Sequence, residues 1–333
     1  MGTYRFILAA LVILSHTGFR VGDYNPGVVA VISFFILSGY VMTKLIDARY
    51  SLLSDVPLFY LDRTARLFPQ FLVYSFATLI AMHLMTFSDV RLTECSARNV
   101  ALNLLMIPLD FYFEIGMDKC LLIPQAWTLG LELCFYLVVP FFLLGIKSSK
   151  TRLLVCAASA VIFIAAFLGL IPTNEFGYIW LPGTFFIFAI GIATARPEKL
   201  DSMLPATAWA LAIILFVTLL FDRQLFAEPY NRETVAGILI GVPAIRLLIK
   251  LPKSKLDETL GNLSYGMFLN HYLLIWWLQD GSMIRLDTWR WRFCLVGLSC
   301  VLSAVTFLGI ERWFLRWRGR LRYRVTATPV VIR

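Results

Sequence analysis

The stretch YRFILAALVILSHTGF, residues 4–19, is apolar apart from one arginine near its start, Arg5, and one histidine near its end, His16. A run of this length and apolarity predicts a membrane-spanning helix. At ~1.5 Å per residue, the two side chains lie roughly 16 Å apart along the helix. Arg5 is then expected at the membrane interface and His16 inside the bilayer. An ionisable group there is costly and indicates a functional site, with a packed histidine as the plain alternative.

The composition of the whole chain agrees with a membrane location. Of 333 residues, 59% are hydrophobic and only 15% are charged, whereas soluble domains carry about 25% charged residues. We therefore expect an all-α, multi-pass integral membrane protein, with membrane lipids around it and no nucleic-acid partner. The whole chain, 1–333, is predicted to form one transmembrane domain that ends in a short basic tail, 317–333.

Ten apolar runs are long enough to cross a bilayer as helices. They cover residues 4–20, 28–46, 67–86, 126–146, 152–172, 177–195, 205–221, 234–251, 262–279 and 291–311. Alternate connecting segments differ in basic charge, because 21 of the 30 Lys and Arg residues fall on the side that holds both chain ends. By the positive-inside rule, the N-terminus and the C-terminus are both predicted to be cytoplasmic.

The longest outer segment, residues 87–125, contains the only two cysteines expected outside the membrane, Cys95 and Cys120. In an oxidising compartment they would form a disulfide, and the alternative is two unpaired thiols. Residues 100–109 are apolar but too short to span, so an interfacial or re-entrant piece is expected there.

Two arginines, Arg63 and Arg66, precede the third predicted span and share a helix face. One interpretation is positive-inside anchoring. The other is a site for a polyanion such as the phosphates of coenzyme A, because Arg gives bidentate contacts to phosphate. No cysteine or histidine spacing indicates a metal site.

Four further polar side chains lie within predicted spans. Glu132 is expected at about the same depth as His16, and a carboxylate at that level could orient the imidazole. The sequence places both on the outer side, but it does not make their helices neighbours. His271 and His83 have packing or interfacial explanations, and Ser38 with Gly39 has the default explanation of close helix packing.

Together these pieces resemble the acyltransferase-3 family of membrane O-acyltransferases in order and spacing. The resemblance covers nearly the whole chain and rests on five motifs: Arg5 with His16, SFFILSGY at 33–40, RTAR at 63–66, WTLGLELCFY at 127–136 and LGNLSYGMFLNH at 260–271. Ten spans with both ends in the cytoplasm is the architecture that the family implies. The chain is similar to the stand-alone members.

The resemblance implies transfer of an acyl group, usually acetyl from cytoplasmic acetyl-CoA, to a sugar hydroxyl at the outer side of the membrane. We expect direct transfer with His16 as general base, helped by Glu132 and Arg5. Arg5, Ser38, Arg63 and Arg66 are expected to bind the acyl-CoA. Succinyl-CoA is a second possible donor. No metal is expected.

The implied location is the bacterial inner membrane. The acceptor would be an exported or cell-envelope polysaccharide or its lipid-linked unit, with exopolysaccharide, O-antigen and small glycosides all open. A proton-coupled transporter or flippase is the competing class, because intramembrane His and Glu also suit a carrier. No inverted repeat is visible between the halves of the sequence, which disfavours that class.

Overall fold

The computed structural model describes residues 1–198, 200, 202–252, 254–281, 287–317 and 319. These residues form helices and connecting loops, with one isolated β-bridge between Val21 and Tyr24. The helices are α1 (Gly2–His16), α2 (Pro26–Arg49), α3 (Val56–Leu84), α4 (Ala97–Leu104), α5 (Trp127–Pro140), α6 (Ser149–Phe167), α7 (Leu181–Ala195), α8 (Leu204–Phe221), α9 (Arg223–Ala227), α10 (Asn231–Leu248), α11 (Lys255–Trp276) and α12 (Trp289–Thr306). The predicted tail, 317–333, lies outside the described residues except for positions 317 and 319.

A helix is present at each of the ten predicted runs. Within the described residues, seven helical segments are long and apolar enough to cross a membrane, and they contain α2, α3, α5, α6, α7, α8 and α12. The helix α1 is apolar but has only 15 residues. The all-helical membrane fold is therefore supported, while the count of ten spans and the orientation of the termini stay predictions.

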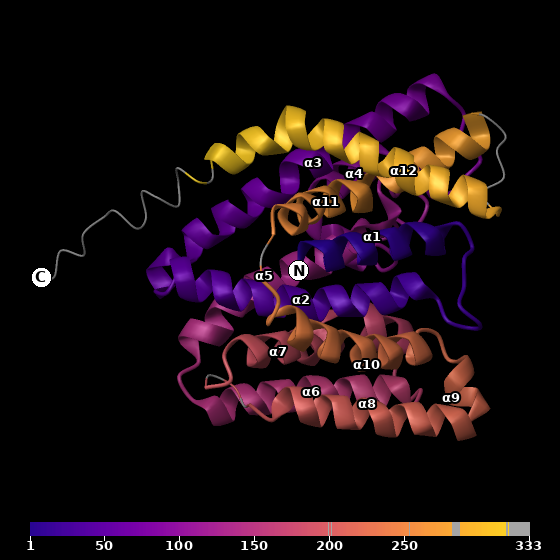
Figure 1. Cartoon of the computed structure of the whole chain (residues 1–333). Coiled ribbons are helices and arrows are strands. Elements are labelled where there is room, and N and C mark those ends of the chain that lie inside the picture. Colours follow the sequence, from indigo (N-terminus) through magenta and orange to yellow (C-terminus); the bar gives the residue numbers. More distant parts are fainter. Residues whose placement is uncertain (199, 201, 253, 282–286, 318, 320–333) are drawn as a thin grey trace, which may run out of the picture.

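The helices lie roughly side by side as a bundle (Figure 1). Helix α2 is central and packs against α1, α5, α7 and α10, whereas α11 packs between α1 and α12. The starts of α2, α4, α6, α9 and α11 are capped by side chains. At α2, for example, the Asn25 carboxamide accepts from the backbone N–H of Gly27. The close packing expected at Gly39 is present, because a Cβ there would lie 2.0 Å from the Phe188 carbonyl oxygen of α7.

Helices α1 and α11 run in the same direction and touch along their lengths. Near their starts Gly2 and Gly261 meet, and a Cβ on Gly2 would lie 1.7 Å from the Asp257 carbonyl oxygen. At the other end His16 contacts His271. Glycine allows this close approach because it has no side chain to separate the two backbones. The contact brings the start of the chain against a helix that begins some 250 residues later.

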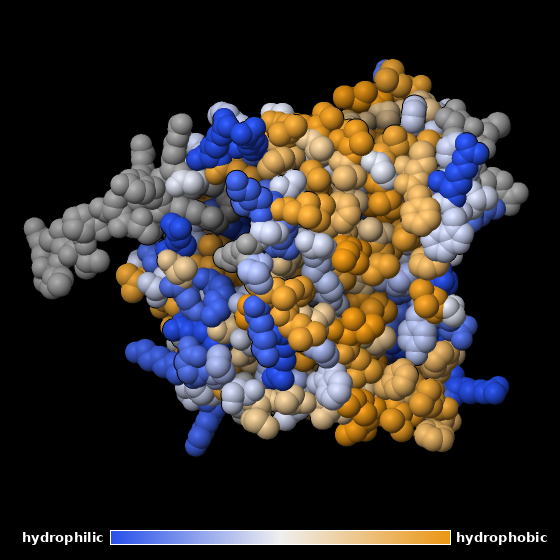
Figure 2. All heavy atoms as spheres, in the orientation of Figure 1, coloured by the Kyte–Doolittle hydropathy of each residue, from blue (hydrophilic) through white to orange (hydrophobic). Residues whose placement is uncertain are grey.

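The surface of the bundle carries apolar side chains across its middle and polar ones toward the helix ends (Figure 2). Helices α8 and α12 are the most outward, with only 22% of their apolar windows buried, against 78% for the segment Glu175–Ala195 that contains α7. Because outward apolar side chains suit lipid and not water, this distribution is the one expected for a membrane bundle.

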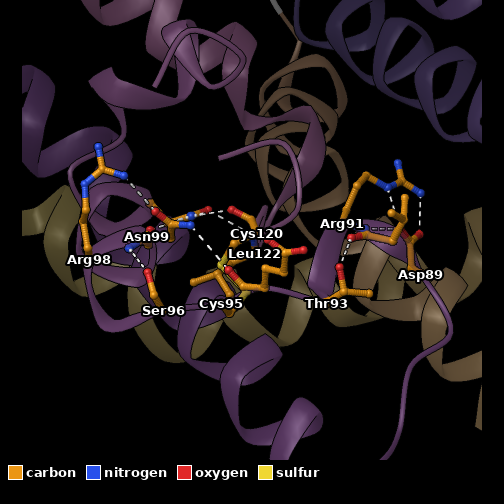
Figure 3. Close-up of a disulfide and its surroundings, with 12 residues drawn as sticks. Asp89, Arg91, Thr93, Cys95, Ser96, Arg98, Asn99, Cys120 and Leu122 are labelled. Carbon is orange, nitrogen blue, oxygen red and sulfur yellow. Dashed lines mark hydrogen bonds and ion pairs between the residues drawn. A yellow bond between two sulfur atoms is a disulfide. The ribbon is translucent and has the colours of Figure 1, made fainter. Parts of the chain in front are cut away.

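Cys95 and Cys120 form the disulfide that was one of the two alternatives for the outer segment (Figure 3). The bond joins the start of α4 to the loop before α5. Asn103 supports the same link, since its Nδ2 donates to the Cys120 carbonyl at 2.8 Å and its Oδ1 accepts from the Leu122 N–H at 3.0 Å. The disulfide and the buried amide therefore give this segment a fixed shape.

Replacing Cys95 with serine should lower the stability of the protein. The bond closes a loop with a sequence separation of 25 residues, and loop entropy alone gives such a crosslink about 3.5 kcal/mol. Thermal unfolding in detergent should show a lower midpoint for Cys95→Ser, with no further loss when Cys120→Ser is added. Cys294→Ser, at an unpaired cysteine of α12, is the matched control. An unchanged midpoint for Cys95→Ser would show that the bond does not stabilise this segment.

Candidate functional site

A large cavity opens among α1, α2, α3, α5 and α11. It encloses about 960 Å³ of empty space, part of it open to the surface. Its lining contains five of the residues that the sequence singled out, and these are Arg5, Ser38, Arg63, Arg66 and Glu132. We call this space the basic cavity, because three guanidinium groups and one carboxylate lie in its wall. The structure thus brings together side chains that lie up to 127 positions apart.

The three arginines of the basic cavity differ in how they are held. Arg63 is ion-paired with its neighbour Asp62, and Arg66 is ion-paired with Glu311. Arg66 also lies over the ring of Tyr265, 5.3 Å from its centroid. The guanidinium of Arg5, by contrast, makes no hydrogen bond or ion pair within the described part of the chain. It is therefore the arginine most readily available to an anion that enters the cavity.

Glu132 is fixed by two hydroxyl groups. Ser38 Oγ and Tyr136 Oη each donate to Glu132 Oε1 at 2.6 Å. These two hydrogen bonds hold the carboxyl group in place. It stands in the wall that also carries Arg5.

The predicted pairing of Glu132 with His16 is wrong. The Nδ1 atom of His16 lies 2.9 Å from Nε2 of His271, and the two rings are stacked with centroids 5.0 Å apart. The helices explain the difference: α1 packs along α11, whereas Glu132 on α5 faces the basic cavity. Similar depth in the membrane does not determine which helices are neighbours.

The hydrogen bonds around His271 indicate which nitrogen of His16 is available. Nδ1 of His271 lies 3.3 Å from the Met267 carbonyl oxygen. A carbonyl only accepts, so this nitrogen carries the proton and leaves Nε2 of His271 as an acceptor. For two neutral imidazoles, His16 Nδ1 then donates to His271, and His16 Nε2 keeps its lone pair. That atom has the electronic state of a general base.

The segment 87–125 contacts the tyrosine that packs against the two histidines. Tyr272 packs against both rings, with centroids 4.8 Å from His16 and 5.3 Å from His271. Arg91 donates to the Tyr272 hydroxyl at 2.7 Å and stacks over its ring. Burial opposes ionisation of Asp89, but hydrogen bonds from Arg91 and Trp276 outweigh it and hold the pKa of Asp89 below its usual value. The charged Asp89 therefore fixes Arg91 over the site.

A second, smaller cavity surrounds His16. It has about 320 Å³ of empty space, part of it open to the surface, and we call it the histidine cavity. The His271 side chain is fully buried, whereas His16 is exposed although its ring packs against those of His271 and Tyr272. His16 is thus accessible to a small molecule that enters the cavity.

The remaining wall of the histidine cavity contains side chains that the sequence interpretation missed. They are two amides and two aromatic rings, namely Asn25, Gln125, Trp127 and Tyr178. Trp127 and Tyr178 pack edge to face at 5.0 Å. Gln125 and Trp127 were recognisable in the sequence, because PQAW at 124–127 places an amide and an indole at the entry to a predicted span. Tyr178 gave no signal, since only the fold brings it there.

His83 lies apart from this site. It is exposed near the end of α3, in accord with the interfacial explanation. The short helix α4 and the turn η3 (Ile107–Phe111) occupy the stretch expected to be interfacial.

The arrangement of a basic cavity next to a histidine suits transfer of a group from an anionic donor. Comparison with known proteins gives the class. The family model described as "Acyltransferase domain" matches residues 3–308, nearly the whole chain. The chain belongs to the acyltransferase-3 family. The resemblance seen in the motifs is thereby confirmed, and the protein is a membrane acyltransferase by family.

Two relatives of this acyltransferase are informative. An uncharacterised protein of Aquifex aeolicus (strain VF5) is 31% identical over 210 residues, which cover 61% of this chain and 91% of that protein. The "Putative peptidoglycan O-acetyltransferase YrhL" of Bacillus subtilis (strain 168) is 25% identical over 326 residues, which cover 86% of this chain. The match spans about half of the Bacillus protein's length. No solved structure matches this acyltransferase.

Proposed function

We propose that this acyltransferase moves an acetyl group from acetyl-CoA to a hydroxyl of a cell-envelope or exported polysaccharide, or of its lipid-linked unit, in the inner membrane of a bacterium. The observation that carries the proposal is the pair of adjoining cavities. One is basic and suits an anionic thioester donor. The other contains an exposed histidine, two amides and two aromatic rings, which suit the hydroxyls and apolar faces of a sugar.

The donor would enter the basic cavity from the cytoplasm. Arg5, Arg63 and Arg66 would contact its phosphates, with Ser38 and Glu132 in the same wall. The orientation is supported by the disulfide, which suits an oxidising compartment and belongs to the segment that contacts Tyr272 beside His16. Because Arg5 and His16 are roughly 16 Å apart along α1, the extended arm of CoA would carry the thioester to the histidine.

The chemistry is a direct transfer. Nε2 of His16 takes the proton of the acceptor hydroxyl, and the oxygen attacks the thioester carbonyl. The tetrahedral intermediate breaks its C–S bond, the CoA thiolate takes the proton back from the imidazolium, and an ester and CoA–SH remain. His271 holds His16 in the tautomer that this step needs.

The wall of the histidine cavity and one relative support the acceptor class that we propose. The Bacillus relative carries peptidoglycan in its printed name, so glycan strands of the cell wall are one candidate acceptor. An exported polysaccharide or its lipid-linked unit is the other. Both present secondary and primary hydroxyls on a sugar ring, and the same site chemistry would serve them.

Sealed inverted vesicles from producing cells test the function, because their cytoplasmic face is outside and their own acceptor is inside. Radiolabelled acetyl-CoA added to the medium should label alkali-releasable esters of the enclosed glycan. Fractionation into peptidoglycan and soluble or lipid-linked polysaccharide identifies the acceptor. Vesicles from cells that lack the gene are the control. No labelling in vesicles that contain the folded protein would refute transfer across the membrane from a cytoplasmic donor.

A further inference from the structure

The two cavities adjoin at three side chains. Val31 of α2, Thr128 of α5 and Phe268 of α11 line both the basic cavity and the histidine cavity. Their exposed fractions are only 6%, 7% and 7%. The three residues come from three helices, α2, α5 and α11, that meet where the two cavities adjoin. We call this set the constriction.

The position of Phe268 is fixed from both cavities. Its ring lies edge to face with Phe34, a lining residue of the basic cavity, at 6.3 Å, and with His271 at 6.2 Å. Its carbonyl oxygen accepts from Nε2 of Gln125 at 2.6 Å. A side chain held in this way presents a defined edge to anything that passes between the cavities.

The constriction is apolar in character. Val31 and Phe268 have no polar side-chain atoms. The hydroxyl of Thr128 donates to the Gln125 carbonyl at 3.0 Å, so its proton is already used. A carboxylate that passed here would lose its water without gaining a partner, and that cost is large.

We propose that Val31, Thr128 and Phe268 form a filter that selects short, uncharged acyl groups, and so excludes succinyl and disfavours chains longer than acetyl. The inference rests on the proposed function, because only the acyl end of the thioester has to reach His16. The CoA moiety stays in the basic cavity, and the acyl group alone meets the constriction. Donor selectivity is then set where the two cavities join and not where CoA binds.

The size of the effect follows from packing. One methylene group that a pocket does not accommodate changes specificity by about 10- to 200-fold. Acetyl-CoA should therefore exceed butyryl-CoA in kcat/KM by at least about 100-fold in the native protein, since the two acyl groups differ by two methylenes. Succinyl-CoA should be the poorest donor because its carboxylate adds a desolvation cost.

Two valines on α2 give a matched test. Val31 and Val41 both line the basic cavity, but only Val31 also lines the histidine cavity. They are ten residues apart, about 15 Å along the helix. Inverted vesicles with native protein, Val31→Ala or Val41→Ala would be supplied with labelled acetyl-, propionyl-, butyryl- or succinyl-CoA, and kcat/KM would be measured for each donor. Phe268→Leu is a second, independent variant of the constriction.

Val31→Ala and Phe268→Leu should raise the butyryl-to-acetyl ratio of kcat/KM by about tenfold or more, while Val41→Ala should leave it within about twofold. Succinyl-CoA should stay a poor donor in all variants, because the widened opening is still apolar. Retained CoA binding shows that each variant is folded.

Three outcomes overturn the filter. An unchanged ratio in both constriction variants means that chain length is selected elsewhere. An equal rise of the butyryl-to-acetyl ratio in Val41→Ala means that either substitution loosens α2 in general. Efficient use of succinyl-CoA by the native protein contradicts an apolar opening. All three leave acetyl transfer itself intact, whereas native vesicles that transfer no acyl group from any donor overturn the proposed function and the filter with it.

Discussion

Replacing His16 with alanine should reduce acetyl transfer by about 10²–10⁴-fold, the usual contribution of a positioned general base. The substitution removes the exposed imidazole that lines the histidine cavity and is oriented by His271. It leaves the basic cavity unchanged, because no residue of its lining is replaced. Acetyl-CoA affinity should therefore stay near the native value while turnover is lost. Transfer in inverted vesicles and CoA binding to the purified protein measure the two quantities separately.

The third histidine of the chain supplies the control. His83 is exposed near the end of α3, away from both cavities, and His83→Ala should transfer acetyl at the native rate. If His16→Ala retained native turnover, the base would have to be another group. If it lost CoA binding along with turnover, the substitution would have disturbed the bundle, and the loss could not be assigned to proton transfer.

Replacing Arg5 with glutamine should weaken CoA binding by about 10- to 150-fold. Among the three arginines of the basic cavity, Arg5 has no ion-pair partner in the described part of the chain, so its removal breaks no ion pair. A hydrogen bond to a charged group contributes about 1.5–3 kcal/mol, which is the stated change in affinity. Calorimetry of CoA binding to the purified protein in detergent measures the loss.

A control variant and a second ligand separate phosphate recognition from a general effect of charge. Arg49→Gln removes an exposed cation at the end of α2, outside the cavity lining, and should leave CoA affinity unchanged. Titration with 3′-dephospho-CoA shows which phosphate is involved. If Arg5 contacts the 3′-phosphate, Arg5→Gln should lose less affinity for 3′-dephospho-CoA than for CoA. Native affinity in Arg5→Gln would contradict a role of this arginine in donor binding.

The helices were predictable because apolar runs need only length and composition to be recognised. The runs at 28–46 and 205–221 appear as α2 and α8 almost unchanged. The third was predicted to start at residue 67, yet α3 begins at Val56 and carries Arg63 and Arg66 inside the helix. The reason is that a helix can continue past its apolar part when its charged side chains pair, as Arg63 does with Asp62.

The site was predictable only in part. Arg5, Arg63, Arg66, Ser38 and Glu132 do line one cavity; their chemical roles stay predictions. The partner of His16 was not predictable, because lateral neighbours in a bundle depend on packing details such as the Gly2–Gly261 contact. The constriction was missed for a related reason: valine, threonine and phenylalanine inside spans look like ordinary core until two cavities are seen on either side of them.

The contact between α1 and α11 has a consequence for biosynthesis. His16 and His271 are separated by 255 positions, and chains elongate at about 5–20 residues per second. The first histidine is therefore made roughly 10–50 seconds before its partner. A nascent chain holds an unpaired His16 throughout that time, with neither its tautomer nor its ring fixed by α11. The ribosome must finish almost the whole protein before α11 can hold this imidazole, so the contacts around His16 are completed only near the end of synthesis.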